Sequence, residues 1–377
     1  MVYTYTATYL FGLEGLLGEE IESLGYRRTE NMDGRITFEG DENACAVCNT
    51  NLRFAERLYL NLGSFQALTF TELFDGTKAL PWEAFIEKDG EFPVSGHAIK
   101  STLFSVPDCQ RIIKKAVSVR LGEHYGLSHL PESGTRYKIE FFLFKDRASL
   151  MIDLSGVPLH KRGYRPETVE APIRETLAAA MVKLARPRED VLLWDPFCGS
   201  GTIAIEAAMI MLNRAPGRNR TFVSEQYPVF PASSWDFARE EADSRVVTDS
   251  SFEAYATDID PKCVEIAAAS AKRAGMEKHL NIFQMDALDI DTLGRRGTIV
   301  TNPPYGDRLL TVEEAEELYR AMGQSFARLE RWQIYVITQS ERFPKLFGRR
   351  ADKIRKLYNG MIPCYYYQFF KNPAKQG

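Results

Sequence analysis

The sequence predicts an α/β protein, in which a doubly wound, mostly parallel sheet follows a smaller α+β region. From about residue 166 to the end, short apolar segments alternate with helical patterns, which is the order of βαβ units. Over residues 1–65 the order is strand, helix, strand, helix, which is typical of an α+β unit. With 377 residues, the chain is long enough for two or three domains.

The composition is that of a globular protein. Hydrophobic residues make up 45% of the chain and charged residues 26%, with 47 Lys and Arg against 51 Asp and Glu. These values exclude a disordered chain and a uniformly basic nucleic-acid binder. No apolar run is long enough to span a membrane and the N-terminus lacks a signal-peptide pattern, so we expect a cytoplasmic protein. Cys45 and Cys48 form a CxxC pair without a second ligand pair, so we expect two packed side chains and no metal site.

The first predicted domain covers residues 1–65. Alternating Thr and Tyr residues predict a strand over Tyr3–Tyr9, and apolar residues at helical spacing predict a helix over Gly12–Leu24. A second strand is expected over Gly34–Glu39, and a second helix from about Ala44.

The second predicted domain covers residues 66–165 and differs in charge. Between Gly96 and Arg165 there are twelve basic and six acidic residues, a net charge of +6, whereas the rest of the chain carries −10. A basic segment on an acidic chain favours contact with phosphates, and RNA is the expected partner. The candidate RNA-binding residues are Lys114, Lys115, Arg120, Lys161, Arg162 and Arg165.

The third predicted domain covers residues 166–377. Helices are expected over Thr202–Leu212 and Pro261–Ala274, and residues 213–251, which contain three prolines, predict an irregular insertion. Ligands of doubly wound sheets bind outside the carboxyl ends of the strands, and every motif described below follows a strand. The expected strands are 191–195, 254–258, 281–286, 298–302 and 333–339.

A glycine-rich loop, DPFCGSGT, joins the first of these strands to its helix. Gly199 and Gly201 allow a tight turn and a close approach to a ligand, and they fit a dinucleotide fingerprint as well as an S-adenosylmethionine loop. Asp258 lies 57 residues beyond Gly201, whereas a dinucleotide site needs an acid about 20 residues on, and Asp195 suits an ammonium group better than a pyrophosphate. The sequence therefore favours S-adenosylmethionine, with the loop residues Asp195, Phe197, Cys198, Gly199, Ser200, Gly201 and Thr202 as cofactor contacts.

Two acidic residues follow the next strands. Asp258 can accept hydrogen bonds from ribose hydroxyls, and Ile259 offers an apolar face to adenine. We expect Asp260 to cap the helix that begins at Pro261. After the third strand, Asp286, followed by Ala287, can accept a hydrogen bond from the adenine amino group.

The sequence NPPYG, residues 302–306, follows the apolar TIVT strand. Two prolines fix the backbone, so the Asn302 side chain and the Pro303 carbonyl can both accept hydrogen bonds from one exocyclic amine. Tyr305 can stack on a planar base. Asn302, Pro303, Pro304 and Tyr305 are therefore the candidate catalytic residues.

Taken together, DPFCGSGT, TDID, MDA and NPPYG resemble the class I S-adenosylmethionine-dependent amino-methyltransferases. HKRGYR at 160–165, APIRET at 171–176 and NPPYGDRL at 302–309 resemble more narrowly the THUMP-containing RNA guanine-N2 methyltransferases, which include bacterial enzymes of 23S rRNA. The resemblance implies a ferredoxin-like domain, a THUMP domain and a Rossmann-like methyltransferase domain. It also implies that the segment around Thr176 covers the methionine end of the cofactor. Residues 353–360, KIRKLYNG, fit the same family.

The expected function is methylation of a guanosine N2 amine in RNA, with 23S rRNA as the expected target. The alternatives are the same chemistry on a tRNA guanosine, another amino group on the same scaffold, and a non-catalytic RNA-binding ribosome-assembly factor. A dinucleotide-dependent oxidoreductase is disfavoured by the position of Asp258 and by the NPPY sequence.

Overall fold

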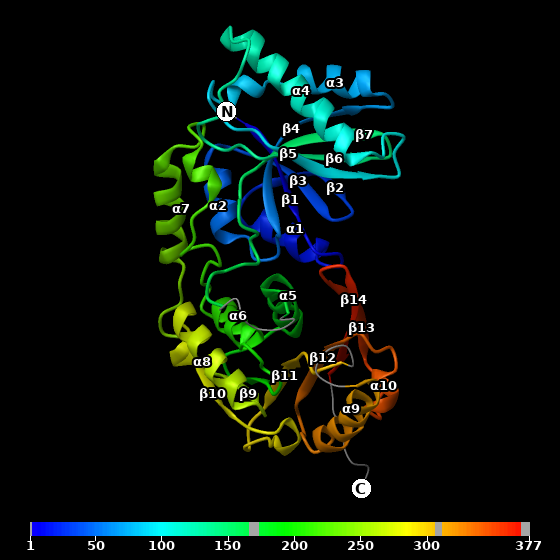
Figure 1. The fold of residues 1–377 in the computed structure, drawn as a ribbon. Helices are drawn as coiled ribbons and strands as arrows, with labels where there is room; N and C mark the ends of the chain where they lie inside the picture. The colour runs from blue at the N-terminus through cyan, green and yellow to red at the C-terminus, as the bar shows by residue number, and fades with distance from the viewer. Residues whose placement is uncertain (1, 166–172, 306–310, 371–377) are drawn as a thin grey trace.

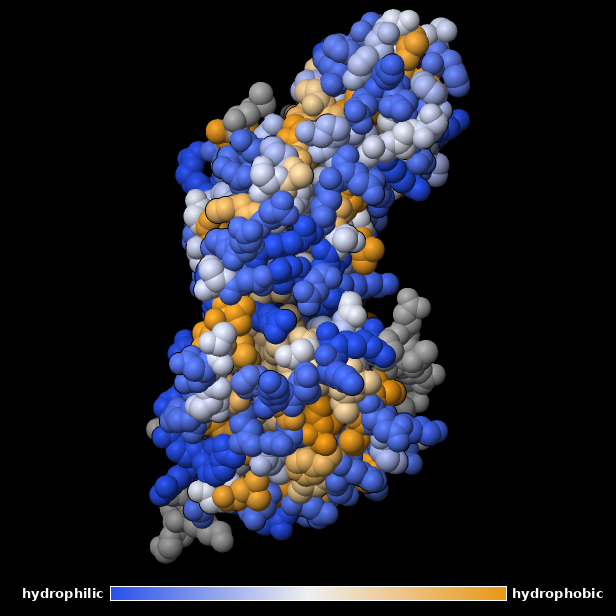
Figure 2. Space-filling model, turned by 90° about the vertical axis from the view of Figure 1, so that its left-hand side faces the viewer, coloured by the Kyte–Doolittle hydropathy of each residue, from blue (hydrophilic) through white to orange (hydrophobic). Residues whose placement is uncertain are grey.

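The computed structural model describes residues 2–165, 173–305 and 311–370. In this part of the chain the strands form two seven-stranded sheets, one above the other in Figure 1. Figure 2 shows a hollow on one side of the molecule, at the height where the two halves meet. None of the helices in the described ranges is long and apolar enough to cross a membrane.

The N-terminal sheet has the strand order β2-β3-β1-β4-β7-β6-β5 and is antiparallel except for the β5–β6 pair. The two strands and two helices predicted over residues 1–65 are present close to their predicted ranges, whereas β2 was not predicted. The strands are β1 (Tyr3–Thr8), β2 (Arg27–Met32), β3 (Arg35–Gly40), β4 (Arg57–Gln66), β5 (Val94–Ile99), β6 (Ile139–Phe144) and β7 (Arg147–Asp153). The helices are α1 (Glu14–Ser23), α2 (Asn43–Asn51), α3 (Phe70–Lys78) and α4 (Val106–Tyr125), with a short 3-10 helix at Trp82–Ala84.

Strand β4 connects the two predicted N-terminal domains. It pairs with β1 on one side and with β7 on the other, and its register shifts between Asn61 and Gly63. The two domains therefore share one continuous sheet.

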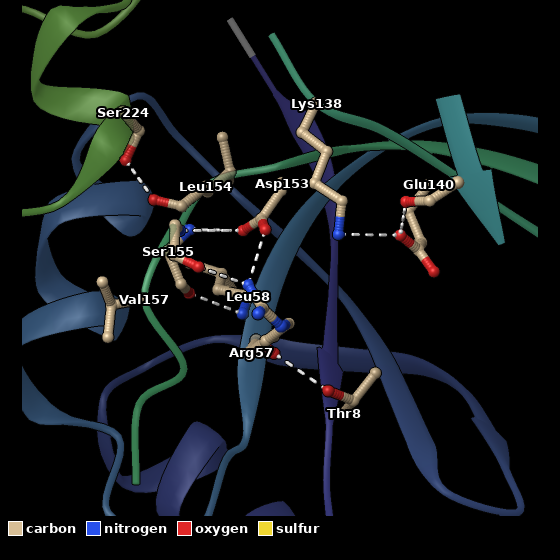
Figure 3. Close-up of polar contacts among 12 residues, drawn as sticks. Thr8, Arg57, Leu58, Lys138, Glu140, Asp153, Leu154, Ser155, Val157 and Ser224 are labelled. Atoms are coloured by element: carbon tan, nitrogen blue, oxygen red, sulfur yellow. Dashed lines mark hydrogen bonds and ion pairs between the residues drawn. The ribbon is translucent and has the colours of Figure 1, made fainter. Parts of the chain in front are cut away.

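The chain leaves the N-terminal sheet after Asp153, as Figure 3 shows. The Asp153 carboxylate lies 2.6 Å from Arg57 Nη1 and accepts the backbone N–H of Ser155 at 2.9 Å. Ser155 Oγ accepts the N–H of Leu58 at 2.9 Å, and Ser224 Oγ donates to the carbonyl of Leu154 at 2.6 Å. These contacts hold the start of the linker between the halves against β4.

The second sheet has the order β10-β9-β8-β11-β12-β14-β13. Its first five strands are parallel, and β14 and β13 form an antiparallel hairpin at one edge. This confirms the predicted doubly wound, mostly parallel sheet. The strands are β8 (Leu192–Asp195), β9 (Ala254–Asp258), β10 (Leu280–Gln284), β11 (Gly297–Thr301), β12 (Gln333–Thr338), β13 (Lys353–Asn359) and β14 (Ile362–Phe369).

Helices cover both faces of this sheet because successive strand residues point in opposite directions. Leu193 belongs to the core that contains α5, α6 and α8, and this core continues into the N-terminal half. Leu192 and Trp194 belong to the core beneath α9 and α10. The helices are α5 (Glu175–Ala185), α6 (Thr202–Met211), α7 (Ala232–Ser244), α8 (Pro261–Ala274), α9 (Val312–Phe326) and α10 (Phe343–Leu346). Short 3-10 helices lie at Val223–Gln226, Glu277–His279 and Ala287–Asp289.

The prediction that residues 213–251 are irregular is wrong for its central part, which forms α7. Trp235, Ala238 and Ala242 lie at helical spacing and are buried. Figure 1 shows α7 beside α2, and Ser234 Oγ donates to Asn43 Oδ1 at 2.6 Å. The insertion therefore packs on the N-terminal half, which is why its helix forms.

Candidate active site

The glycine loop after β8 needs left-handed backbone at two positions. Gly199 has φ +51° and Gly201 has φ +77°, a conformation that side chains other than glycine disfavour. A Cβ on Gly201 would lie 3.1 Å from Ala267 Cβ on α8, whereas a Cβ on Gly199 would have no atom within 4 Å. The loop therefore packs closely on α8 at Gly201 and faces open space at Gly199, where a ligand can approach the backbone.

Asp195 ends β8 and connects the glycine loop to the NPPY turn. Its Oδ1 accepts a hydrogen bond from Thr301 Oγ1 at 2.7 Å and from the Phe197 N–H at 3.3 Å, and both Asp195 and Thr301 are buried. Burial raises the pKa of the Asp195 carboxyl to about 7. In the described ranges its other oxygen accepts no hydrogen bond. Asp195 is therefore poised to ionise when a cation approaches.

Asp258 holds the loop from the end of β9. Its two carboxylate oxygens accept the N–H groups of Gly199 at 2.9 Å and Asp260 at 3.1 Å. The next residue, Ile259, is 65% exposed and offers an apolar surface beside this carboxylate. Asp260 Oδ1 accepts the N–H of Lys262 at 2.9 Å, which confirms the predicted helix cap.

Asp286 follows β10 at the same edge of the sheet. Its Oδ1 accepts the N–H of Leu288 at 2.9 Å, and Ala287 between them is buried. The N–H of Met285 donates to the Asp258 carbonyl at 3.0 Å, so the ends of β9 and β10 are joined directly. The predicted cofactor residues on three strands therefore lie along one edge.

Three loop side chains are turned into the protein. Cys198 is buried beneath the loop, and Ser200 Oγ and Thr202 Oγ1 are buried 3.0 Å apart. Phe197 instead packs, partly buried, against the core beneath α9.

The NPPY turn follows β11 and is held from behind by a chain of hydroxyl groups. The Tyr319 hydroxyl on α9 donates to the Pro304 carbonyl at 3.2 Å and lies 2.9 Å from Thr338 Oγ1 at the end of β12. Thr338 Oγ1 in turn accepts the N–H of Ser340 at 3.2 Å. Tyr319 and Thr338 were not predicted as site residues, because in sequence both look like ordinary core positions of a helix and a strand.

The front of the turn is partly open. Pro303 is buried, whereas Asn302 and Tyr305 are partly exposed, and Tyr305 packs against the core beneath α9. Gly306, the last residue of the NPPYG motif, lies outside the described residues.

Thr176, predicted beside the cofactor, is buried and has its hydroxyl bonded to the N-terminal half. It donates to Glu56 Oε1 at 2.6 Å, and Glu56 Oε2 lies 2.6 Å from Arg174 Nη1 and 2.9 Å from His160 Nδ1. Burial alone would raise the pKa of the Glu56 carboxyl, but His160, Thr176 and Arg174 outweigh it and lower this pKa to about 2. Residues 171 and 172 of the predicted APIRET segment lie outside the described ranges.

The prediction that Arg162 contacts RNA is wrong, because its guanidinium is buried at the junction of the two halves. It donates to the carbonyls of Leu159 and Arg53, each at 2.5 Å, and lies 3.6 Å from Glu206 on α6. Arg53 and Tyr164 also contact Glu206, at 3.3 and 3.0 Å. The HKRGYR motif therefore supplies ionic contacts that join the halves.

The other candidate RNA-binding cations fall into two groups. Lys114 pairs with Glu132, Arg120 lies 2.5 Å from Glu83, and Arg165 lies 3.3 Å from Glu175. Lys115 and Lys161 are exposed, and neither has an acidic partner among the described residues. Most of the candidate cations are thus paired with acids, Lys114 and Arg120 within the N-terminal half and Arg162 and Arg165 with acids on α6 and α5.

The buried cysteines behave as expected. Cys45 and Cys48 are completely buried, and Cys45 Sγ lies 3.4 Å from Ser224 Oγ. This confirms that the CxxC pair consists of packed side chains. Across residues 2–165, 173–305 and 311–370, no group of three or more His, Cys, Asp and Glu side chains is placed to hold a metal ion.

Three regions of the chain match known protein families. Residues 4–59 match the RlmL ferredoxin-like domain, residues 67–153 the THUMP domain, and residues 162–368 the RMKL-like methyltransferase domain.

Similar proteins cover the whole chain. It is 45% identical over 379 aligned residues to the "Putative RNA methyltransferase YpsC" of Bacillus subtilis, covering 99% of this chain and 97% of that protein. It is 34% identical to the "Ribosomal RNA large subunit methyltransferase K/L" of Psychromonas ingrahamii, covering 94% of this chain but only 48% of that protein. The solved structure of SMU.472, "a putative methyltransferase complexed with SAH", superposes with a TM-score of 0.93 at 40% identity, over 99% of each chain.

Proposed function

The chain belongs to the RMKL-like methyltransferase family with RlmL ferredoxin-like and THUMP domains, and from this premise we propose that it methylates the N2 amine of a guanosine in RNA, with 23S rRNA as its target. The enzyme is an S-adenosylmethionine-dependent methyltransferase. The observation that carries the proposal is the buried hydrogen bond from Thr301 to Asp195. This hydrogen bond connects the glycine loop, which we assign to the cofactor, with the NPPY turn, which we assign to the target amine.

The cofactor fits the open side of the loop. The Asp195 carboxylate would bind the ammonium group of the cofactor, and that cation would stabilise the ionised form of this buried acid. Asp258, already oriented by two backbone N–H groups, accepts the ribose hydroxyls. Ile259 packs on the adenine, and the unbonded oxygen of Asp286 accepts the adenine amine.

The NPPY turn positions the target amine. When bound, the cofactor supplies a sulfonium methyl group, which forms a C–N bond as its C–S bond breaks and the electron pair stays on sulfur. Asn302 Oδ1 and the Pro303 carbonyl accept the two amine hydrogens, so the nitrogen lone pair is directed away from the turn. Tyr305 stacks on the base, and the proton of the methylated amine passes to solvent. Positioning of the amine therefore carries the rate enhancement.

RNA as the substrate is supported by the THUMP match and by the names of the relatives. One relative is named as an enzyme of large-subunit ribosomal RNA, and this chain spans about half of its length. Guanine and its N2 position are supported by the narrower resemblance of the motifs at 160–165 and 302–305. Methylation of a tRNA guanosine uses the same residues, so the test must separate the two RNAs.

The test is mass spectrometry of nucleosides from separated rRNA and tRNA of a deletion strain. We expect N2-methylguanosine to fall in 23S rRNA, to return with the intact gene, and to stay low with Asn302→Ala. Loss of N2-methylguanosine from tRNA alone would show that tRNA is the target. Loss of a different methylated base would refute the guanine assignment. Unchanged RNA in the deletion strain would favour the non-catalytic alternative.

In vitro, Asn302→Ala should lower single-turnover methyl transfer by roughly 10²–10³-fold, as the loss of one preorganised polar contact does. Cofactor affinity, measured by calorimetry, should stay near that of the unaltered protein, since the glycine loop and Asp258 are untouched. Near-normal transfer would contradict the role given to the NPPY turn.

A further inference from the structure

The strand order places the target on one side of the NPPY turn. The predicted cofactor residues lie at the carboxyl ends of β8, β9 and β10, and the NPPY turn follows β11. In the strand order β10-β9-β8-β11, the cofactor therefore covers the ends of the first three strands. The RNA that carries the target guanosine must extend over the other side, where β12, β14 and β13 lie.

The β13–β14 hairpin bounds this side and is fixed against the N-terminal half. β13 runs parallel to β12, because both pair with β14 in the antiparallel sense, so the turn at Gly360 lies at the carboxyl edge of the sheet. Gly12 packs so closely on the hairpin that a Cβ there would lie 2.7 Å from the Lys356 carbonyl. The rings of Phe11 and Tyr358 meet edge to face at 5.7 Å. Figure 1 shows the hairpin tip reaching the region of α1.

This tip exposes apolar and aromatic groups beside an unneutralised cation. Met361 is 86% exposed, Phe11 46% and Ile362 44%. Lys356 is exposed on the same strand face as Tyr358, with its Nζ 5.8 Å from the Tyr358 ring. In the part of the chain that the structure describes, no acidic side chain pairs with Lys356, nor with its strand neighbours Lys353 and Arg355.

We propose that the tip of the β13–β14 hairpin, together with Phe11, is the RNA-docking surface next to the active site. Met361, Phe11 and Tyr358 contact the bases that flank the target guanosine, and Lys356 binds a backbone phosphate. This inference rests on the proposed function, since it assumes that the substrate is RNA.

Charge and position favour RNA over a protein partner for this surface. Single-stranded nucleic acid is bound by aromatic and apolar groups that contact bases, combined with cations along the backbone. Lys114 and Arg120, by contrast, are neutralised by Glu132 and Glu83. Removing a guanosine from its stack also exposes neighbouring bases, which an apolar side chain such as Met361 can cover.

The test compares two variants of the tip with two matched controls. Lys356→Glu is paired with Lys278→Glu, because Lys278 is exposed before β10, at the opposite edge of the sheet. Met361→Ser is paired with Phe237→Ser, because Phe237 is 54% exposed on α7. The RNA is 23S rRNA from the deletion strain, and binding is measured at several salt concentrations alongside the rate of methyl transfer.

Lys356→Glu should weaken RNA binding about tenfold at low salt and reduce the salt slope by about one, as expected for one lost phosphate contact. Met361→Ser should raise the KM for RNA about fivefold, as expected for a weakened base contact, with the salt slope unchanged. Cofactor affinity should not change in any variant. If both tip variants bind RNA as their controls do, the surface is not an RNA-binding site. Binding of a protein partner would then be the remaining explanation for its exposed apolar residues.

The unaltered protein separates this inference from the proposed function. If it does not transfer methyl groups to guanosine in RNA, the proposed function fails. If it does so while the tip variants match their controls, only the docking surface is refuted.

Discussion

Replacing Tyr319 with phenylalanine removes one oxygen atom from behind the NPPY turn and leaves the ring in place. Tyr319 is buried, and its ring packs edge to face on Phe343 at 4.9 Å, so the fold should be retained. The change leaves the Pro304 carbonyl and the Thr338 hydroxyl without the Tyr319 partner. Loss of one hydrogen bond of this kind costs about 1 kcal/mol, and more where a buried group stays unpaired.

This cost should appear in catalysis if Tyr319 is a positioning residue for the turn. Without this hydrogen bond the turn is supported less firmly from behind, so Pro303 and Asn302 hold the amine less well in the transition state. An effect of about 1–1.4 kcal/mol corresponds to a five- to tenfold lower kcat. The KM for RNA and the affinity for the cofactor should change little, because no binding group is removed.

The assay is single-turnover methyl transfer with saturating RNA, beside calorimetric cofactor binding. Tyr366→Phe is the matched control, since Tyr366 is also buried and its hydroxyl donates to a backbone carbonyl, that of Met181, at 2.8 Å. Both variants should lose similar stability in urea unfolding. If Tyr319→Phe turns over as fast as Tyr366→Phe, the hydroxyl chain supports only the fold, and its assigned effect on the turn is refuted.

Three further predictions concern charges that the structure buries. Burial raises the pKa of Asp195 to about 7, and a bound ammonium group would lower this pKa. Cofactor affinity should therefore rise with pH up to about 7 and then level off. Calorimetry in two buffers should show that binding releases a proton, and Asp195→Asn should abolish this release. Glu206→Ala leaves Arg53 and Arg162 without their buried partner, so the free energy of unfolding in urea should fall by about 3–5 kcal/mol, whereas exposed Glu265→Ala should be nearly neutral. The pKa of Glu56 is lowered from 4.5 to about 2, so its contribution to the free energy of unfolding is present above pH 4.5 and is lost as the pH falls toward 2. Glu56→Gln should make the free energy of unfolding depend less on pH in this range. An unchanged pH dependence would contradict the stabilising role given to the Glu56 carboxylate.

The placement of the candidate site residues was predictable because they follow a local rule. Each motif stands directly after an apolar strand, and parallel strands bring their carboxyl ends to one edge. Asp195, Asp258 and Asn302 therefore lie at the ends of neighbouring strands, although more than 100 residues separate the first from the last. The cap at Asp260 was predictable for the same local reason, since its bond spans only two residues.

Two of the elements that were missed, β2 and α7, show only a weak hydrophobic pattern in the sequence. β2 reads RRTENM and is exposed along almost its whole length, so it shows no hydrophobic alternation. It forms because β3 offers a free edge, which adds backbone hydrogen bonds. Helix α7 was missed because the prolines that precede it and its own polar residues obscure a short apolar stripe, which packs beside α2.

The sequence by itself determined the type of sheet and the positions of the glycine loop and the NPPY turn at the ends of their strands. These depend on neighbouring residues, whose spacing sets backbone conformation and the face on which a side chain lies. Only the tertiary structure decided which charges are free to bind RNA. Arg162 and Glu206 are 44 residues apart and Arg120 and Glu83 are 37 apart, yet each pair meets and cancels. Coulomb attraction depends on distance in space and on burial, so a basic segment in the sequence is not yet a basic surface.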